Sequence, residues 1–203
     1  MPTFVKTLLL VLAGTALGLC VTLVTLERGV DFNAIKAGPW VAFPKNGTAD
    51  SDPYSRAILM RSGEIPLATS EGLSFIARRD SAGAPFTPRC DYTLQGQIPQ
   101  ARYWTLTLLS PKGFLIDTGT GNGADYGIES GEERHGFTST EILRNNNGDF
   151  VITLSRHARP GNWLPLGQSS FILLLRLYDT ELGAMTSALN DRNMPKVVKG
   201  GCT

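Results

Sequence analysis

Alternation of apolar and polar residues is the main pattern in the middle of the chain, and it predicts β-strands. Apolar side chains take every second position in residues 73–78, 90–95, 102–110 and 150–155. Alternate residues of a strand point to opposite faces, so each segment predicts one buried face and one solvated face. The repeated pattern indicates a mainly β domain. We expect the first two segments to form a hairpin around the turn at residues 80–85.

The longest apolar run beyond the N-terminal segment lies within residues 162–180. Its core, residues 171–177, is short, is preceded by two serines and is followed by Asp179 and Thr180. Because both of its faces are apolar for most of its length, we expect a central strand that is covered from both sides. A leucine-rich helix is the alternative, since leucine has good helix propensity.

Three other segments have local structural signals. Asp52-Pro53 predicts the start of a short helix that ends near Gly63 and covers one edge or end of the sheet. Asn147-Gly148 predicts a hairpin turn between residues 140–144 and the strand that follows it. Residues 196–199 are consistent with an edge strand.

The N-terminal segment differs from the rest of the chain, because residues 7–26 hold no charged side chain. A helix of that length crosses a hydrocarbon core of about 30 Å, so we expect an uncleaved membrane anchor. A cleaved signal peptide and a buried core helix are the alternatives. We therefore divide the chain into an anchor, residues 1–28, and a β-sandwich domain, residues 29–203.

Length and charge limit the classes of function. The chain has 203 residues, a formal net charge of +1 and 22 glycines. This length fits one domain plus an extra segment, and the glycine content favours an all-β domain. Nucleic-acid binding usually requires a clustered basic face, so we expect no nucleic-acid partner.

The cysteines bear on the compartment. Cys90 and Cys202 are the two cysteines outside the apolar segment, and Cys20 lies within it. In an exported domain they predict one disulfide, which the loop-entropy argument values at about 4–5 kcal/mol as an upper estimate. Two unrelated buried thiols are the alternative.

Arg176 is the first candidate for binding, because it interrupts an otherwise apolar strand. A guanidinium offers a fork of donors to a carboxylate or a sugar-like ligand. The alternative is a structural salt bridge to Asp179 or Asp117, or a position at a strand end in water. Trp163, Asn162 and Trp104 could floor a pocket for a small amphiphile or sugar, although tryptophans more often fill a sandwich core.

Other signals of chemistry are weak. The two histidines are His135 and His157, and the first follows Glu129, Glu132 and Glu133 with a spacing that fits no ordered zinc motif. The glycine-rich residues 119–124 resemble a dinucleotide-binding turn, but no helical pattern follows them. No nucleophile-elbow motif is present. We therefore expect no metal and no cofactor, and we lean against an enzyme.

Several motifs resemble one family. They are YWTL at residues 103–106, NNG at 146–148, PGNWLP at 160–165 and LRLY at 175–178. This combination resembles the domain-of-unknown-function 1214 family. The apolar helix, the Asp52-Pro53-Tyr54 helix start and the cysteine pair resemble its short, single-domain bacterial members.

The resemblance implies a β-sandwich or jelly-roll-like domain in a bacterial envelope protein, and it implies no reaction. It also implies that the partner domain of the larger, two-domain relatives is lacking here. Together these signals predict a single-pass protein of the bacterial inner membrane, tethered by residues 7–26, with its C-terminal domain in the periplasm. We expect that domain to bind a ligand or a protein partner. The alternative is a hydrolase of an envelope glycan or small ester, with residues 118–136 as one wall of its active site.

Overall fold

The computed structural model describes residues 2–28, 34–62, 65–116, 134–180, 189 and 193–202. In this part of the chain the elements, in order, are α1 (Pro2–Arg28), β1 (Ile35–Ala37), β2 (Trp40–Ala42), the 3-10 helix η1 (Pro44–Gly47), α2 (Pro53–Ser62), β3 (Gly72–Ala77), β4 (Cys90–Gly96), β5 (Tyr103–Leu109), β6 (Gly136–Thr138), β7 (Phe150–Ser155), β8 (Asn162–Pro165), β9 (Ile172–Tyr178) and β10 (Lys196–Cys202).

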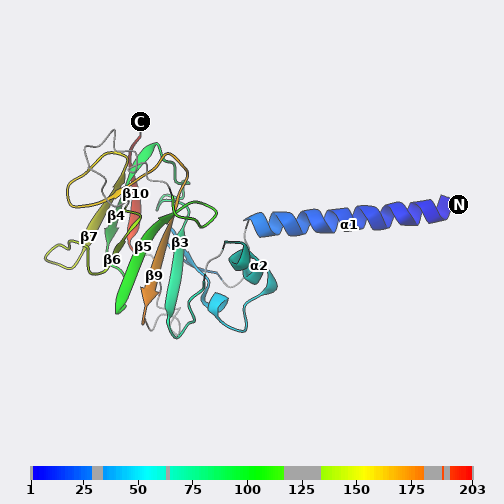
Figure 1. Cartoon of the computed structure of the whole chain (residues 1–203), viewed down its shortest axis with the longest axis horizontal. Helices are drawn as coiled ribbons and strands as arrows, with labels where there is room; N and C mark the ends of the chain where they lie inside the picture. Colours follow the sequence, from blue (N-terminus) through cyan, green and yellow to red (C-terminus); the bar gives the residue numbers. More distant parts are fainter. Residues whose placement is uncertain are drawn as a thin grey trace.

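The strands form two sheets (Figure 1). The larger has the order β1-β2-β3-β9-β5-β6, and the smaller has the order β10-β4-β7-β8. Neighbouring strands are antiparallel except for the parallel pair β7 and β8. Aromatic side chains join the two layers, since Trp104 of β5 stacks on Phe150 of β7 with ring centroids 5.6 Å apart. The prediction of a mainly β, sandwich-like domain is confirmed.

The expected central strand is also confirmed. β9 lies between β3 and β5, where Leu175 is in register with Phe75 on one side and Leu106 on the other. These three side chains are buried on the inner face. On the outer face Ile172 and Leu174 are also buried, as expected for a strand covered from both sides.

The structure divides the stretch 162–180 between the two sheets. β8 belongs to the smaller sheet and β9 to the larger one. The chain crosses from one layer to the other within a few residues. What the sequence presents as one apolar stretch therefore has one part in each layer.

The predicted hairpin between residues 73–78 and 90–95 is wrong. β3 pairs with β2 and β9, whereas β4 pairs with β10 and β7. The expected turn does form, because the Asp80 carboxylate accepts hydrogen bonds from the N–H groups of Ala82 and Ala84 at 2.9 and 2.8 Å. It leads from one sheet to the other. Alternation reports which face of a strand is buried, and it does not report which strand is its neighbour.

The predicted turn at Gly148 is present, but the hairpin around it is incomplete. The Gly148 N–H donates to the Asn145 carbonyl at 2.9 Å, and Gly148 has a φ of 84° that favours glycine. The expected strand at 140–144 is reduced to one isolated bridge between Arg144 and Phe150. β6, which pairs with β5, lies at the end of the segment expected to be a loop.

Two specific bonds fix the ends of the sandwich. The disulfide between Cys90 and Cys202 joins opposed residues of β4 and β10, which confirms the predicted pairing and the predicted edge strand. Trp40 of β2 is fully buried, and its indole N–H donates to the Pro195 carbonyl at 2.7 Å. Trp40 therefore links the larger sheet to the segment that leads into β10.

Both helices follow the sequence signals. α1 contains an apolar span, Thr3–Leu26, that is long enough to cross a membrane, and it projects away from the sandwich (Figure 1). α2 begins after Asp52, whose carboxylate accepts hydrogen bonds from the backbone N–H groups of Tyr54 and Ser55, each at 3.0 Å. The hydrogen bonds from Ser55 hold the pKa of Asp52 below its usual value. α2 lies between α1 and the larger sheet (Figure 1).

Candidate functional site

Arg176 lies on the outer face of the larger sheet, at the centre of a row of hydroxyl groups. It is in register with Ser74 of β3 on one side and Thr105 of β5 on the other. Thr138 of β6 continues the row beside Thr105. Residues that pair across strands point to the same face, so three hydroxyl side chains and one guanidinium share this surface. All four residues are half-buried.

Two tyrosines lie next to this row. Tyr103 of β5 and Tyr178 of β9 are directly paired, and their rings have centroids 6.0 Å apart. Tyr178 is two residues beyond Arg176 and therefore points to the same face. Guanidinium, hydroxyl and phenol groups on one face can together contact a ligand that has both a carboxylate and a sugar-like ring. We call Ser74, Arg176, Thr105, Tyr103 and Tyr178 the Arg176 face.

Arg176 also connects the central strand to the chain before β3. Its Nη2 donates to the Ile65 carbonyl oxygen at 3.4 Å. Of the two expected ionic partners, Asp179 forms an exposed pair with Arg102 at 3.5 Å, and Asp117 lies outside the described residues. An exposed pair of this kind contributes little to stability. The bond to Ile65 holds the guanidinium beside its own sheet.

Trp163 lies on the other outer surface of the sandwich. It is in register with Thr153 of β7, which in turn pairs with Thr93 of β4. Its neighbour Leu164 is fully buried on the inner face, so the indole points outward. The indole N–H donates to the Ser155 carbonyl at 3.0 Å. Arg176 and Trp163 therefore face opposite sides of the domain.

The side chain of Asn162 is hydrogen-bonded to the backbone of the domain itself. It is buried, and its side-chain amide donates to the carbonyl oxygens of Leu143 and Val151 at 2.8 and 2.9 Å. Its amide oxygen accepts from the Leu143 N–H at 2.8 Å. Both donors and one acceptor site of the amide are thus occupied by the chain itself. The side chain joins the segment before β7 to the start of β8.

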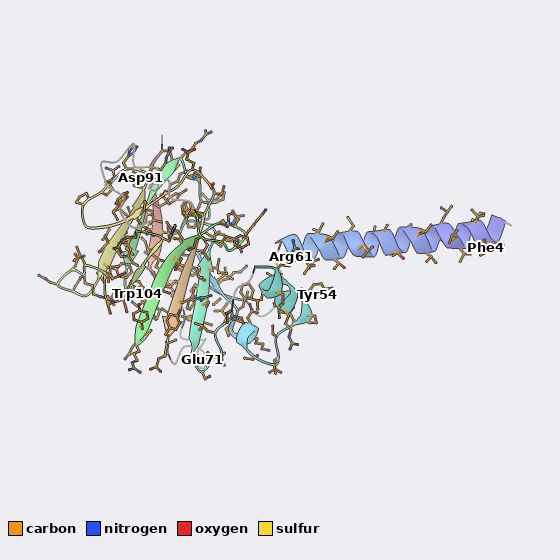
Figure 2. All side chains as sticks on the ribbon, viewed as in Figure 1. Phe4, Tyr54, Arg61, Glu71, Asp91 and Trp104 are labelled. Carbon is orange, nitrogen blue, oxygen red and sulfur yellow. A yellow bond between two sulfur atoms is a disulfide. The ribbon has the colours of Figure 1, made fainter. Side chains whose placement is uncertain are left out.

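Trp104 is part of the core, with only 3% of its surface exposed. It lies between the layers against Phe150, inside the sandwich (Figure 2). The four residues predicted to bind a ligand are therefore placed apart. Arg176 and Trp163 face outward on opposite sheets, whereas Asn162 and Trp104 are buried, and for all four the role in binding remains a prediction.

The weak sequence signals for metal and dinucleotide binding fall mostly outside the described residues. This applies to Glu129, Glu132, Glu133 and the glycine-rich residues 119–124. His135 immediately precedes β6, and its carbonyl accepts the Leu108 N–H at 2.7 Å. His157 is exposed. In the part of the chain that the structure describes, no three side chains of His, Cys, Asp or Glu gather as ligands for a metal.

Sequence reasoning did not identify the partners of Arg176 on its own face. The alternation in residues 103–109 does place Tyr103 and Thr105 on a solvated face. It does not reveal that this strand lies beside β9, or that Ser74 reaches the same row from β3. The missing information was the order of the strands.

Comparisons with known proteins support the fold and name a family. The family described as "Protein of unknown function (DUF1214)" matches residues 71–182, which is more than half of the chain. No curated protein matches.

Two solved structures are similar to the chain. The VPA0106 protein from Vibrio parahaemolyticus has a TM-score of 0.55 at 16% identity, and the match covers 97% of this chain and 46% of that one. An uncharacterized protein from Burkholderia cenocepacia has a TM-score of 0.41 at 16% identity, with 95% and 51% covered. The chain thus spans about half the length of these relatives. At this identity the likeness to the Vibrio protein shows the fold alone.

Proposed function

The chain belongs to the DUF1214 family, and from this premise we propose that it is a membrane-tethered binding module of the bacterial envelope. In this proposal α1 holds the β-sandwich at the periplasmic side of the inner membrane. The Arg176 face binds a ligand that carries a carboxylate and a sugar-like ring. The protein acts by binding and does not catalyse a reaction.

Two features support the proposed location. α1 contains an apolar span of 24 residues, long enough for a bilayer. The disulfide joins residues that are 112 positions apart in the sequence. Stable disulfides form in oxidising compartments, which include the bacterial periplasm. Both features fit a domain that is exported and remains attached.

The single observation that carries the proposed binding role is the row of polar groups across the larger sheet. Ser74, Arg176 and Thr105 come from three adjacent strands, so the sheet itself fixes their spacing. Groups placed on rigid strands need little ordering when a ligand binds, and this reduces the entropic cost of binding. A guanidinium pairs with a carboxylate through two parallel hydrogen bonds. Tyrosine rings offer apolar faces beside polar hydroxyls.

Binding can be tested with the full chain in detergent and short oligomers of galacturonate as the probe. Calorimetric titration of the unmodified chain should give a saturable signal. Arg176→Gln should weaken the affinity by about tenfold, since a hydrogen bond to a charged group contributes roughly 1.5–3 kcal/mol. Arg159→Gln, whose guanidinium pairs with Asp91 on the other sheet, is the matched control and should leave the affinity unchanged. An unmodified chain that does not bind, or a loss of affinity in the control alone, would sink the proposed binding role.

The location has its own test. A reporter enzyme that is active only outside the cytoplasm, fused after Thr203, should be active in cells. A fusion that is active only as a cytoplasmic reporter would reverse the orientation and remove the reason for the disulfide.

A further inference from the structure

α2 presents a surface of two large apolar side chains and two arginines to solvent. Met60 is 86% exposed and Tyr54 is 39% exposed, whereas Ser55 is buried. An α-helix turns about 100° per residue, so Met60 falls on the side that faces away from Ser55, between Arg56 and Arg61. Ile65, shortly after the helix, is 79% exposed. Large apolar side chains that are exposed next to arginines suit the boundary between water and a membrane.

The position of α2 identifies what covers this surface. α2 contacts α1, and it lies where α1 meets the domain (Figure 1). Arg61 lies near the domain end of α1, and Tyr54 lies on the side of the domain toward α1 (Figure 2). None of the apolar span of α1 is buried against the domain. A bilayer that surrounds α1 must therefore end close to α2.

We infer that α2 and Ile65 lie in the headgroup region of the membrane that α1 enters, with Met60 and Tyr54 inserted and Arg61 at the phosphates of anionic lipids. This inference rests on the proposed function, because it requires α1 to be in a membrane. A helix with apolar residues between basic ones binds at the interface and buries its apolar side at the boundary of the acyl chains. Tyrosine is enriched at that depth, and arginine extends toward the phosphates.

Hydrogen bonds within the domain hold α2 in place without any contribution from lipid. Asp52 caps the helix, and its carboxylate also accepts the Ser55 hydroxyl at 2.5 Å. Arg56 donates through Nη2 to the Ala49 carbonyl at 2.6 Å, which attaches the helix to the segment before it. These bonds attach the start of α2 to the segment before it, and the Met60 side chain stays exposed.

The inference also connects the membrane to the Arg176 face. Ile65 follows α2 in the chain with its side chain exposed, and its carbonyl oxygen accepts the hydrogen bond from Arg176. The residue proposed to enter the headgroup region is therefore hydrogen-bonded to the proposed ligand-binding arginine. The sandwich is then held close to the membrane, and the Arg176 face is fixed relative to it.

The test uses the full chain in vesicles of phosphatidylethanolamine and phosphatidylglycerol. A nitroxide spin label is attached at Met60→Cys in a Cys20→Ser background, and its accessibility to oxygen and to a water-soluble nickel complex is measured. The label should be several-fold more accessible to oxygen, relative to nickel, than a label at Val151→Cys on the smaller sheet. Val151 is 42% exposed and serves as the matched control. Replacing phosphatidylglycerol with phosphatidylcholine should reduce this difference, and Arg61→Gln should reduce it as well.

The native Cys20 separates the two ways to fail. Cys20 is an exposed free cysteine in α1, so a label on it reports whether α1 is in the bilayer. A Cys20 label shielded from nickel with a Met60→Cys label as accessible to nickel as the Val151→Cys label would overturn the inference and leave the tether intact. A Cys20 label that is open to nickel would remove the tether and the inference together.

Discussion

The two sheets of the sandwich are held together in different ways. The larger sheet is organised around β9, whose inner face is buried and apolar and whose outer face is buried at Ile172 and Leu174. The smaller sheet has specific bonds at its margins, namely the disulfide between Cys90 and Cys202 and the Asn162 amide bonded to Leu143 and Val151. The comparison teaches that a strand between two long neighbours is stabilised by burial. A strand at a margin, which has a neighbour on one side alone, is held in addition by bonds of defined geometry.

The disulfide should give the largest effect. Cys90→Ser together with Cys202→Ser should lower the free energy of unfolding by about 4 kcal/mol, because the crosslink closes a long loop and reduces the entropy of the unfolded chain. Urea unfolding in detergent, followed by tryptophan fluorescence, measures the change. Cys20→Ser, which alters no disulfide, is the control and should leave the midpoint unchanged. A double variant as stable as its parent would show that the smaller sheet does not depend on its crosslink.

Leu175→Ala should cause the next largest loss in the free energy of unfolding. Leu175 is fully buried in β9 between Phe75 and Leu106, so removing its side chain leaves a cavity that costs about 3 kcal/mol. The same unfolding experiment applies, with Val151→Ala on the smaller sheet as control. Val151 is partly exposed, and its truncation should change stability by less than about 0.5 kcal/mol. Equal effects of the two changes would contradict a larger sheet held by burial.

Asn162→Ala should cost about 2 kcal/mol. The change removes a buried amide and leaves backbone groups of Leu143 and Val151 without the partner that now bonds them. Asn146→Ala, in the exposed turn, is the matched control. Hydrogen exchange should show the loss locally, in β7 and β8, before it appears in global unfolding. Uniform loss of protection across both sheets would mean that the Asn162 bonds are not local to the smaller sheet.

The sequence predicted which face of each strand is buried more successfully than it predicted which strands pair with each other. Trp104, Leu106 and Leu108 were expected on one face, and all three are buried. The central strand was found because residues 171–177 are apolar on both faces, a feature that is local to the strand. The false hairpin of β3 and β4 came from nearness in sequence, and partners are decided by long-range packing. The disulfide was predictable because two cysteines outside the apolar segment allow one pairing.

The candidate site was predicted in part for the same reason. Arg176 could be identified from the sequence alone, because a charged residue on an apolar strand needs a partner or access to water. Its relation to Thr105 and Tyr103 depends on β5 lying beside β9. Trp163 and Asn162 belong to the same stretch as Arg176, residues 162–180, but the chain changes sheets between them and β9. Nearness to Arg176 in the sequence therefore did not mean a shared surface.

The smallest expected effect concerns α2, which belongs to neither sheet. Asp52→Ala removes the cap of α2 and should cost about 1 kcal/mol, whereas Asp52→Asn keeps an accepting oxygen and should cost less. The pKa of Asp52 is lowered, first by the hydrogen bond from the Ser55 side chain, so the folded state favours the carboxylate. A lowered folded-state pKa gives stability that is present above the ordinary aspartate pKa of 3.8 and is lost as the pH falls through the folded-state pKa. Acid should therefore loosen α2 in the parent and have less effect in Asp52→Asn, as read from hydrogen exchange of the α2 amides.

If α2 lies in the headgroup region, vesicles containing phosphatidylglycerol should restore protection to α2 in Asp52→Ala, because lipid then stabilises the helix independently of its cap. Lack of recovery in vesicles would count against a position of α2 in the headgroup region. It would not affect the conclusion that the two sheets are stabilised in different ways.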